Sequence, residues 1–182
     1  ESALKNIKLL EDNDFYNIVL SLKASDVQKT IKAYQLISKL TDYPLHLGIT
    51  ESGSLFTGTI KSSIGIGTLL SQNIGDTIRV SLSADPVEEV KVAKQILQSL
   101  GLRRFGIEVT ACPTCARANY DVSKIALELE EATKHIKIPL KIAIMGCAGN
   151  GPGEAEEADL GIVGGKDQCL LYKDGEIIEK IT

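Results

Sequence analysis

The first hundred residues alternate predicted strands with predicted helices, and this alternation is the strongest constraint on the fold. Apolar runs at 17–22, 45–49 and 77–82 predict buried strands, and a segment with helical periodicity follows each of them. Strand-then-helix units repeated roughly every thirty residues are typical of parallel sheets with right-handed connections. The sequence therefore predicts an α/β fold for this part of the chain.

Signals for helix starts support this assignment. Ser25 with Gln28 three residues later predicts a capping box. Asp85 followed by Pro86 predicts a second start, with Asp85 as the N-cap and proline in the first turn. A further helix is expected at residues 2–10, before the first predicted strand.

Polar residues occur at the same relative place in each unit, within or just after the end of each predicted strand. They are Lys23, then His46, Thr50 and Glu51, then Arg79 and Ser81. In a (β/α)8 barrel the carboxyl ends of the strands carry the binding and catalytic groups. Any one of these residues could equally mark the point where a strand leaves the core. Together, the three strands favour a ligand-facing rim.

The predicted α/β segment is too short to close a barrel. About four helices and three strands precede residue 101, and the resulting open parallel edge is hazardous for a natural protein. The chain also opens at Glu1, without methionine, in a predicted helix. We therefore expect residues 1–101 to be the C-terminal part of a TIM barrel from a longer protein.

Residues 102–182 predict a second, smaller α+β domain after a glycine-flanked boundary at 101–106. Its expected elements are strands at 107–110, 140–145 and 160–163, a helix at 122–132, and a hairpin at 169–181 that turns at Asp174-Gly175.

Cysteines in this second domain suggest a metal site. Cys112 and Cys115 form a CxxC pair, and Cys147 follows in Met-Gly-Cys-Ala-Gly-Asn-Gly-Pro-Gly-Glu, which ends at Glu154. Neither group has a further cysteine or histidine close by in the sequence, so the pattern favours an iron–sulfur cluster bound by three cysteines with one iron open. Glu154 is either an exchangeable ligand of that iron or an acidic residue in the first turn of a helix. Asn150 is either a turn former or a substrate contact.

Other types of site remain as alternatives. A zinc-stabilised binding domain would need a fourth ligand, and Cys169 is available, although it lies in an apolar Cys-Leu-Leu-Tyr segment. An iron–sulfur electron carrier would need four cysteine ligands of its own. Ile64-Gly65-Ile66-Gly67 lacks the third glycine of a dinucleotide fingerprint, and its glycines fit helix packing better.

Composition excludes several classes of protein. The net charge is −4 and the basic residues are scattered, which disfavours a nucleic-acid surface. No apolar run approaches the roughly 18 residues of a membrane span. Four cysteines without secretory features indicate a reducing compartment, so the cytoplasm is expected.

Several longer motifs resemble one known family. They are Leu-His46-Leu-Gly-Ile-Thr50-Glu51, Gly-Asp-Thr-Ile-Arg79-Val-Ser81, Asp85-Pro-Val-Glu-Glu-Val, Cys112-Pro-Thr-Cys115 and Gly-Cys147 through Asn150 to Glu154. Together they are similar to the 4-hydroxy-3-methylbut-2-enyl diphosphate synthases of the methylerythritol phosphate isoprenoid pathway, in their two-domain bacterial form. The resemblance implies a TIM barrel followed by an iron–sulfur domain of sulfite-reductase-like type.

The resemblance also implies roles for individual residues. Cys112, Cys115 and Cys147 would bind a 4Fe–4S cluster, and Glu154 would bind its fourth iron until substrate displaces it. Substrate contacts would come from the rim and from the cysteine loop, with Glu51 as a candidate proton donor. The substrate-binding set is Lys23, Thr50, Arg79, Ser81 and Asn150.

The implied reaction is the two-electron reductive ring opening of 2-C-methyl-D-erythritol 2,4-cyclodiphosphate, with flavodoxin or ferredoxin as electron donor. The family resemblance further implies a head-to-tail homodimer. Because the family's first barrel half is absent from these 182 residues, we expect them to be inactive by themselves even if they bind a cluster.

Overall fold

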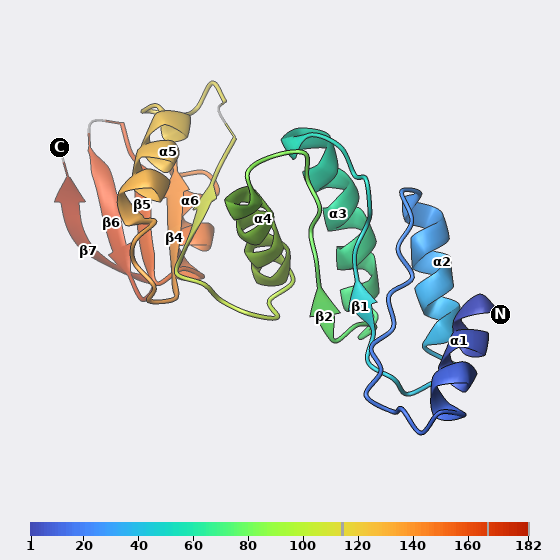
Figure 1. The fold of residues 1–182 in the computed structure, drawn as a ribbon. Coiled ribbons are helices and arrows are strands. Elements are labelled where there is room, and N and C mark those ends of the chain that lie inside the picture. The colour runs from blue at the N-terminus through green and yellow to red at the C-terminus, as the bar shows by residue number, and fades with distance from the viewer. Residues whose placement is uncertain (114, 167, 182) are drawn as a thin grey trace. The chain divides into compact units, whose positions relative to one another are not determined.

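The computed structural model describes residues 1–113, 115–166 and 168–181, and the chain divides into two compact units. The first unit is Glu1–Arg104 and the second is Phe105–Thr182. Figure 1 shows the helices and strands of each unit. Among the described residues, no helix combines the length and the apolar character that crossing a membrane requires.

The first unit alternates helices with short parallel strands, in the order that the sequence predicts. Its elements are α1 (Ser2–Glu11), α2 (Val27–Ile37), β1 (His46–Leu47), α3 (Leu55–Leu70), β2 (Thr77–Ile78) and α4 (Pro86–Ser99). β1 pairs in parallel with β2, and Leu20 forms a single parallel bridge with Leu45. The predicted α/β character is therefore confirmed.

The strands of the first unit are much shorter than predicted. The run at 17–22 contributes one bridge, and the runs at 45–49 and 77–82 pair over two residues each. Backbone bonds join neighbouring segments at isolated points, such as Leu20 N to Pro44 O at 2.8 Å and Arg79 N to Leu47 O at 2.9 Å. Regular ladders need partners along their full length, and the described part of this unit offers few.

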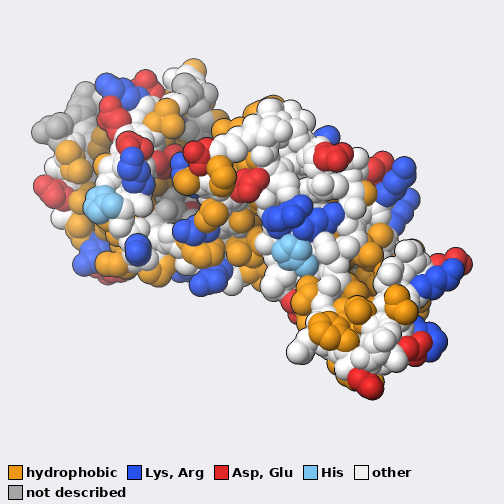
Figure 2. Space-filling view, viewed as in Figure 1, with side chains coloured by type: hydrophobic (Ala, Val, Ile, Leu, Met, Phe, Trp, Pro, Cys, Tyr) orange, Lys and Arg blue, Asp and Glu red, His pale blue; other side chains and the backbone are white. Residues whose placement is uncertain are grey.

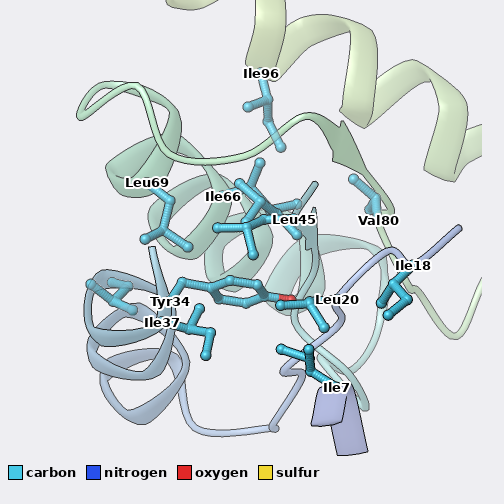
Figure 3. Close-up of a cluster of buried hydrophobic side chains, with 12 residues drawn as sticks. Ile7, Ile18, Leu20, Tyr34, Ile37, Leu45, Ile66, Leu69, Val80 and Ile96 are labelled. Carbon is cyan, nitrogen blue, oxygen red and sulfur yellow. The ribbon is translucent and has the colours of Figure 1, made fainter. Parts of the chain in front are cut away.

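A single apolar core holds the first unit together (Figure 3). Tyr34 of α2 lies at its centre and is fully buried. Its hydroxyl donates to the carbonyl of His46 at 2.5 Å and accepts from the backbone N–H of Leu22 at 2.8 Å. Because buried hydroxyls need partners, this pair fixes the first two strand segments beside each other. The same burial raises the pKa of Tyr34.

One predicted helix start is confirmed and the other is wrong. Asp85 caps α4 by accepting from the backbone N–H of Val87 at 2.8 Å, with Pro86 in the first turn. For α2 the cap is Asp26 rather than Ser25, because the Asp26 carboxylate accepts from Lys29 N at 2.8 Å. Asp26 has the extended backbone of an N-cap, so the predicted capping box begins one residue too early.

The second unit is a mixed five-stranded sheet with the order β3-β4-β5-β6-β7. Its elements are β3 (Ile107–Ala111), α5 (Val122–Thr133), β4 (Leu140–Met145), α6 (Gly151–Glu156), β5 (Leu160–Gly164), β6 (Cys169–Lys173) and β7 (Glu176–Ile181). The first three strands are parallel, and β6 and β7 form the predicted antiparallel hairpin. Its turn residues, Asp174 and Gly175, both have positive φ.

Small residues let the two helices of the second unit pack on opposite faces of its sheet. Gly161 of β5 faces α6, where an added Cβ atom would lie 2.5 Å from the Cβ of Ala155. Gly146, just after β4, faces the start of α5, where a Cβ would lie 2.8 Å from Val122. β3 and β4 are parallel neighbours, so the cysteine loops that follow their carboxyl ends begin side by side.

Candidate functional site

The two cysteine loops of the second unit leave neighbouring parallel strands at the same edge of the sheet. Cys112 follows β3 directly, and its backbone N–H donates to Ile144 O of β4 at 3.1 Å. Cys147 follows β4 after one glycine, Gly146. Side chains at the carboxyl ends of parallel strands are well placed for ligands, so the sheet brings the two halves of the cysteine motif together.

Cys112, Cys115 and Cys147 line one cavity of about 120 Å³. Its other described walls are Pro113, Arg117, Met145, Asn150 and Gly151. The three predicted cluster ligands therefore face a common space. All four cysteines of the chain are free thiols.

The backbone of Gly146 contacts the sulfur of Cys112. Its N–H donates to the sulfur of Cys112 at 3.2 Å, which is a contact that also stabilises a thiolate. A Cβ atom at this position would lie 2.9 Å from Ala118 as well as against α5, so a larger residue would push the loop away. Gly146 is thus required by close packing against Val122 and Ala118, next to the sulfur of Cys112.

Cys115 is exposed, and its surroundings favour the thiolate form. The backbone N–H of Arg117 is the largest cause that lowers the pKa of Cys115, and the Arg117 guanidinium lowers it further. The backbone N–H of Ala118 acts in the same direction. Since thiolates rather than thiols bind metals, the lowered pKa favours the form of Cys115 that binds a metal.

The structure places Asn150 and Glu154 at the start of α6. Asn150 is the N-cap residue and lines the cavity, and its side chain makes no capping bond. Glu154 is exposed in the first turn of the helix and is not among the described cavity walls. A role for Glu154 as an iron ligand therefore stays a prediction, and its placement matches the helix-start alternative.

The spacing of Cys112, Cys115 and Cys147 around the cavity distinguishes a single metal ion from a cluster as the group that fits. Among the described residues, no three His, Cys, Asp or Glu side chains are close enough together to hold a single metal ion. Zinc requires ligands at about 2.0–2.3 Å from one centre, whereas a cluster takes each thiolate on a different iron. Three cysteine sulfurs around the wall of one cavity fit a cluster, with the backbone N–H of Gly146 beside one of them.

Tyr120 also supports this edge of the sheet, and sequence reasoning missed it. Its hydroxyl contacts the carbonyls of Met145 and Ile162, at 3.0 and 3.4 Å, and so ties the ends of β4 and β5 together. Burial is the main cause that raises the pKa of Tyr120, and Cys169 and Cys112 raise it further. A single tyrosine in a loop carries no sequence signal for such a role.

The first unit contains the predicted polar rim. Figure 2 shows basic side chains gathered beside a histidine on the face in view. The Lys23 side chain lies over Gly48, where an added Cβ would be 3.1 Å from Lys23 Cε. Burial, followed by the charge of Arg79, lowers the pKa of Lys23. Burial also lowers the pKa of His46, and Lys23 and Arg79 lower it further.

The other rim residues, Ser81, Thr50 and Glu51, differ in their hydrogen bonds and exposure. Arg79 donates to the Ser81 hydroxyl at 3.1 Å, and the buried Ser52 hydroxyl, which sequence reasoning missed, donates to the Ser81 carbonyl. Thr50 N donates to Ala24 O, next to Lys23, at 3.2 Å. Glu51 is exposed with φ of 51°, an uncommon conformation for a residue other than glycine. Arg79 thus contacts Ser81 directly, and its positive charge acts on Lys23 by repulsion.

Comparison with protein-family models matches both units. The GcpE TIM-barrel domain matches residues 1–94, and the GcpE protein C-terminal domain matches residues 108–182. The first match supports a barrel-family fold for the first unit.

The curated relatives of this chain include enzymes named 4-hydroxy-3-methylbut-2-en-1-yl diphosphate synthase (flavodoxin). That of Caldanaerobacter subterraneus is 62% identical over 97% of this chain and 50% of its own length. That of Clostridium acetobutylicum is 58% identical over 100% of this chain and 52% of its own. The chain thus spans about half the length of the curated relatives it matches. By these matches, the chain belongs to the GcpE family.

Proposed function

We propose that these residues form the cluster-binding part and the end of the substrate barrel of a 4-hydroxy-3-methylbut-2-enyl diphosphate synthase. The proposed substrate is 2-C-methyl-D-erythritol 2,4-cyclodiphosphate, in isoprenoid biosynthesis. Two electrons and two protons enter, the C2–O bond to the ring phosphate and the C3–O bond break, a C2=C3 double bond forms, and water leaves. The observation that carries the proposal is the cavity lined by Cys112, Cys115 and Cys147.

In this proposal the three cysteines hold a 4Fe–4S cluster in a domain of sulfite-reductase-like type. Glu154 binds the fourth iron when substrate is absent. When bound, such a cluster supplies electrons and an iron that acts as a Lewis acid. The chain's own contribution is a set of thiolates, sulfur hydrogen bonds such as that from Gly146, and a glycine-rich loop that admits close approach.

The rim residues would bind the diphosphate. Lys23 and Arg79 bring positive charge, which offsets the charge of the phosphates. Ser81 and Thr50 offer hydroxyls, and Asn150 offers an amide that capping leaves available. Glu51 would donate a proton to the departing oxygen.

The partners follow from the same assignment. The relatives' name specifies flavodoxin, so flavodoxin, or a ferredoxin in its place, is the proposed electron donor. The proposed assembly of the full-length enzyme is a homodimer. Free thiols persist in reducing compartments, which supports the cytoplasm as its location.

The test is metal analysis of the full 182-residue chain, purified without oxygen and reconstituted with iron and sulfide. We expect about four irons and four sulfides per chain, with visible absorption. Cys147→Ser should lose most of both. Cys169→Ser is the matched control and should keep them, because Cys169 lies in β6 and is not among the described cavity walls.

The alternative is a zinc-stabilised domain, and the same measurement separates the two. Stoichiometric zinc without visible absorption, lost in Cys169→Ser, would overturn the cluster and favour the structural metal site.

A further inference from the structure

Arg117 places a positive charge at the cysteine cavity. It follows the CxxC pair by two residues and lines the same cavity as all three cysteines. Among the described residues that line this cavity, Arg117 is the only basic side chain. The other described walls are thiols, apolar groups, glycine and the neutral amide of Asn150.

The side chain contacts both cysteine loops. On the first loop, Arg117 lies two residues after Cys115 and lines the cavity together with it. On the second loop, its terminal nitrogen lies 3.5 Å from the position that a Cβ atom of Gly149 would occupy. The sulfur of Cys147 lies 3.4 Å from that same position. The guanidinium therefore lies beside Gly149 of the second loop, on the wall of the cavity that the three cysteines share.

The charge of Arg117 is available to the cavity. None of the ion pairs formed among the described residues involves Arg117. A guanidinium stays protonated at all ordinary pH values, so its charge does not depend on the state of the site. A fixed cation beside the cavity stabilises whichever state of a bound group is more negative.

We propose that Arg117 is a positioning residue that stabilises the reduced state of the cluster, an inference that rests on the function proposed above. Reduction adds one electron to the bound group, so the reduced form gains more from the guanidinium than the oxidised form does. Net charge and hydrogen bonds to sulfur are the main protein influences on cluster potential. The arginine would thus make the group easier to reduce by the electron donor.

The experiment compares the reduction midpoint of the reconstituted full chain with those of Arg117→Gln, Arg117→Lys and Lys173→Gln. Each protein is titrated with dithionite and followed by visible absorption, and iron and sulfide are counted first. Lys173→Gln is the matched control, because it also removes one positive charge, but at the opposite end of the sheet beside Leu160. The lysine variant keeps the charge if the glutamine variant binds the cluster poorly.

We expect Arg117→Gln to lower the reduced-to-oxidised ratio at the wild-type midpoint about tenfold, a shift of about 59 mV for a one-electron couple. Arg117→Lys should recover most of the shift, and Lys173→Gln should show none. Equal midpoints for all four proteins would overturn the role of Arg117 while leaving the cluster intact. Absence of a cluster in the wild-type chain would overturn the proposed function, and this inference with it.

Discussion

His46 shows how burial and neighbouring charges change the pKa of a single residue in the rim of the first unit. Its Nδ1 lies 2.7 Å from the Thr77 hydroxyl, across the β1–β2 pair. Burial, Lys23 and Arg79 all favour the neutral ring and lower its pKa below 6.5. The folded protein therefore binds fewer protons at this ring than the unfolded chain does just below pH 6.5. Stability should fall as the pH drops through that window.

We predict that Lys23→Met raises the pKa of His46 while Lys23→Arg leaves it nearly unchanged. Methionine keeps the apolar stem over Gly48 but removes the charge, so the repulsion is lost and the burial is kept. The ring-proton chemical shift of His46, followed by NMR against pH, gives the midpoint directly. Equal midpoints in the methionine and arginine variants would show that Lys23 does not act on His46 through its charge.

At the residue scale, the proximity of the three cysteines could be predicted from the sequence, whereas their role as cluster ligands stays a prediction. The spacing of Cys112 and Cys115 and the glycines around Cys147 indicated a common site, and the structure brings all three to one cavity. Arg117 was missed because an arginine after a CxxC pair has many possible roles. Only the path of the second loop, which carries Gly149 against the guanidinium, distinguishes them.

Among the elements, α3 depends on two of its glycines, Gly58 and Gly65, for its position in the first unit. At Gly58 a Cβ atom would lie 2.5 Å from Leu82, and at Gly65 it would lie 2.5 Å from the buried side chain of Ile49. At Gly67 a Cβ atom would meet nothing within 4 Å. Helix packing, predicted for both Gly65 and Gly67, is thus confirmed for Gly65 and wrong for Gly67.

This contrast gives a matched pair of substitutions in one helix. Gly65→Ala should destabilise the chain by about 1–3 kcal/mol, because Ile49 must move in a packed core. Gly67→Ala should stabilise it by about 0.5–1 kcal/mol, because alanine is the better helix former and has room. Urea unfolding at constant m-value reports both changes. Equal effects of the two substitutions would contradict the close packing of Gly65 against Ile49.

Element types were predictable from the sequence, but strand lengths in the first unit were not. Apolar runs around Leu20, Leu47 and Val80 correctly located buried extended segments. Whether such a segment becomes a regular strand depends on hydrogen-bond partners along its whole length, which a local pattern does not contain. In the second unit, β4 is flanked by β3 and β5, and its predicted bounds at 140–145 are confirmed.

At the scale of the whole molecule, the described residues supply a complete sheet in one unit and a small part of a barrel in the other. Closure of a (β/α)8 barrel requires eight strands, whereas the described part of the first unit has the two-stranded sheet β1-β2 and one bridge. The curated relatives are about twice as long as this chain. We therefore expect a polypeptide of these 182 residues to bind the cluster but to turn over substrate poorly.

We predict that this polypeptide, loaded with cluster, converts the cyclodiphosphate at least about a thousandfold more slowly than the full-length Clostridium acetobutylicum relative. Orientation of a bound substrate contributes several orders of magnitude to rate, and an open barrel rim cannot hold the diphosphate on all sides. Product formation is measured without oxygen, with the same chemically reduced flavodoxin for both proteins. Comparable rates would mean that Lys23, Arg79 and their neighbours position the substrate without the rest of a barrel.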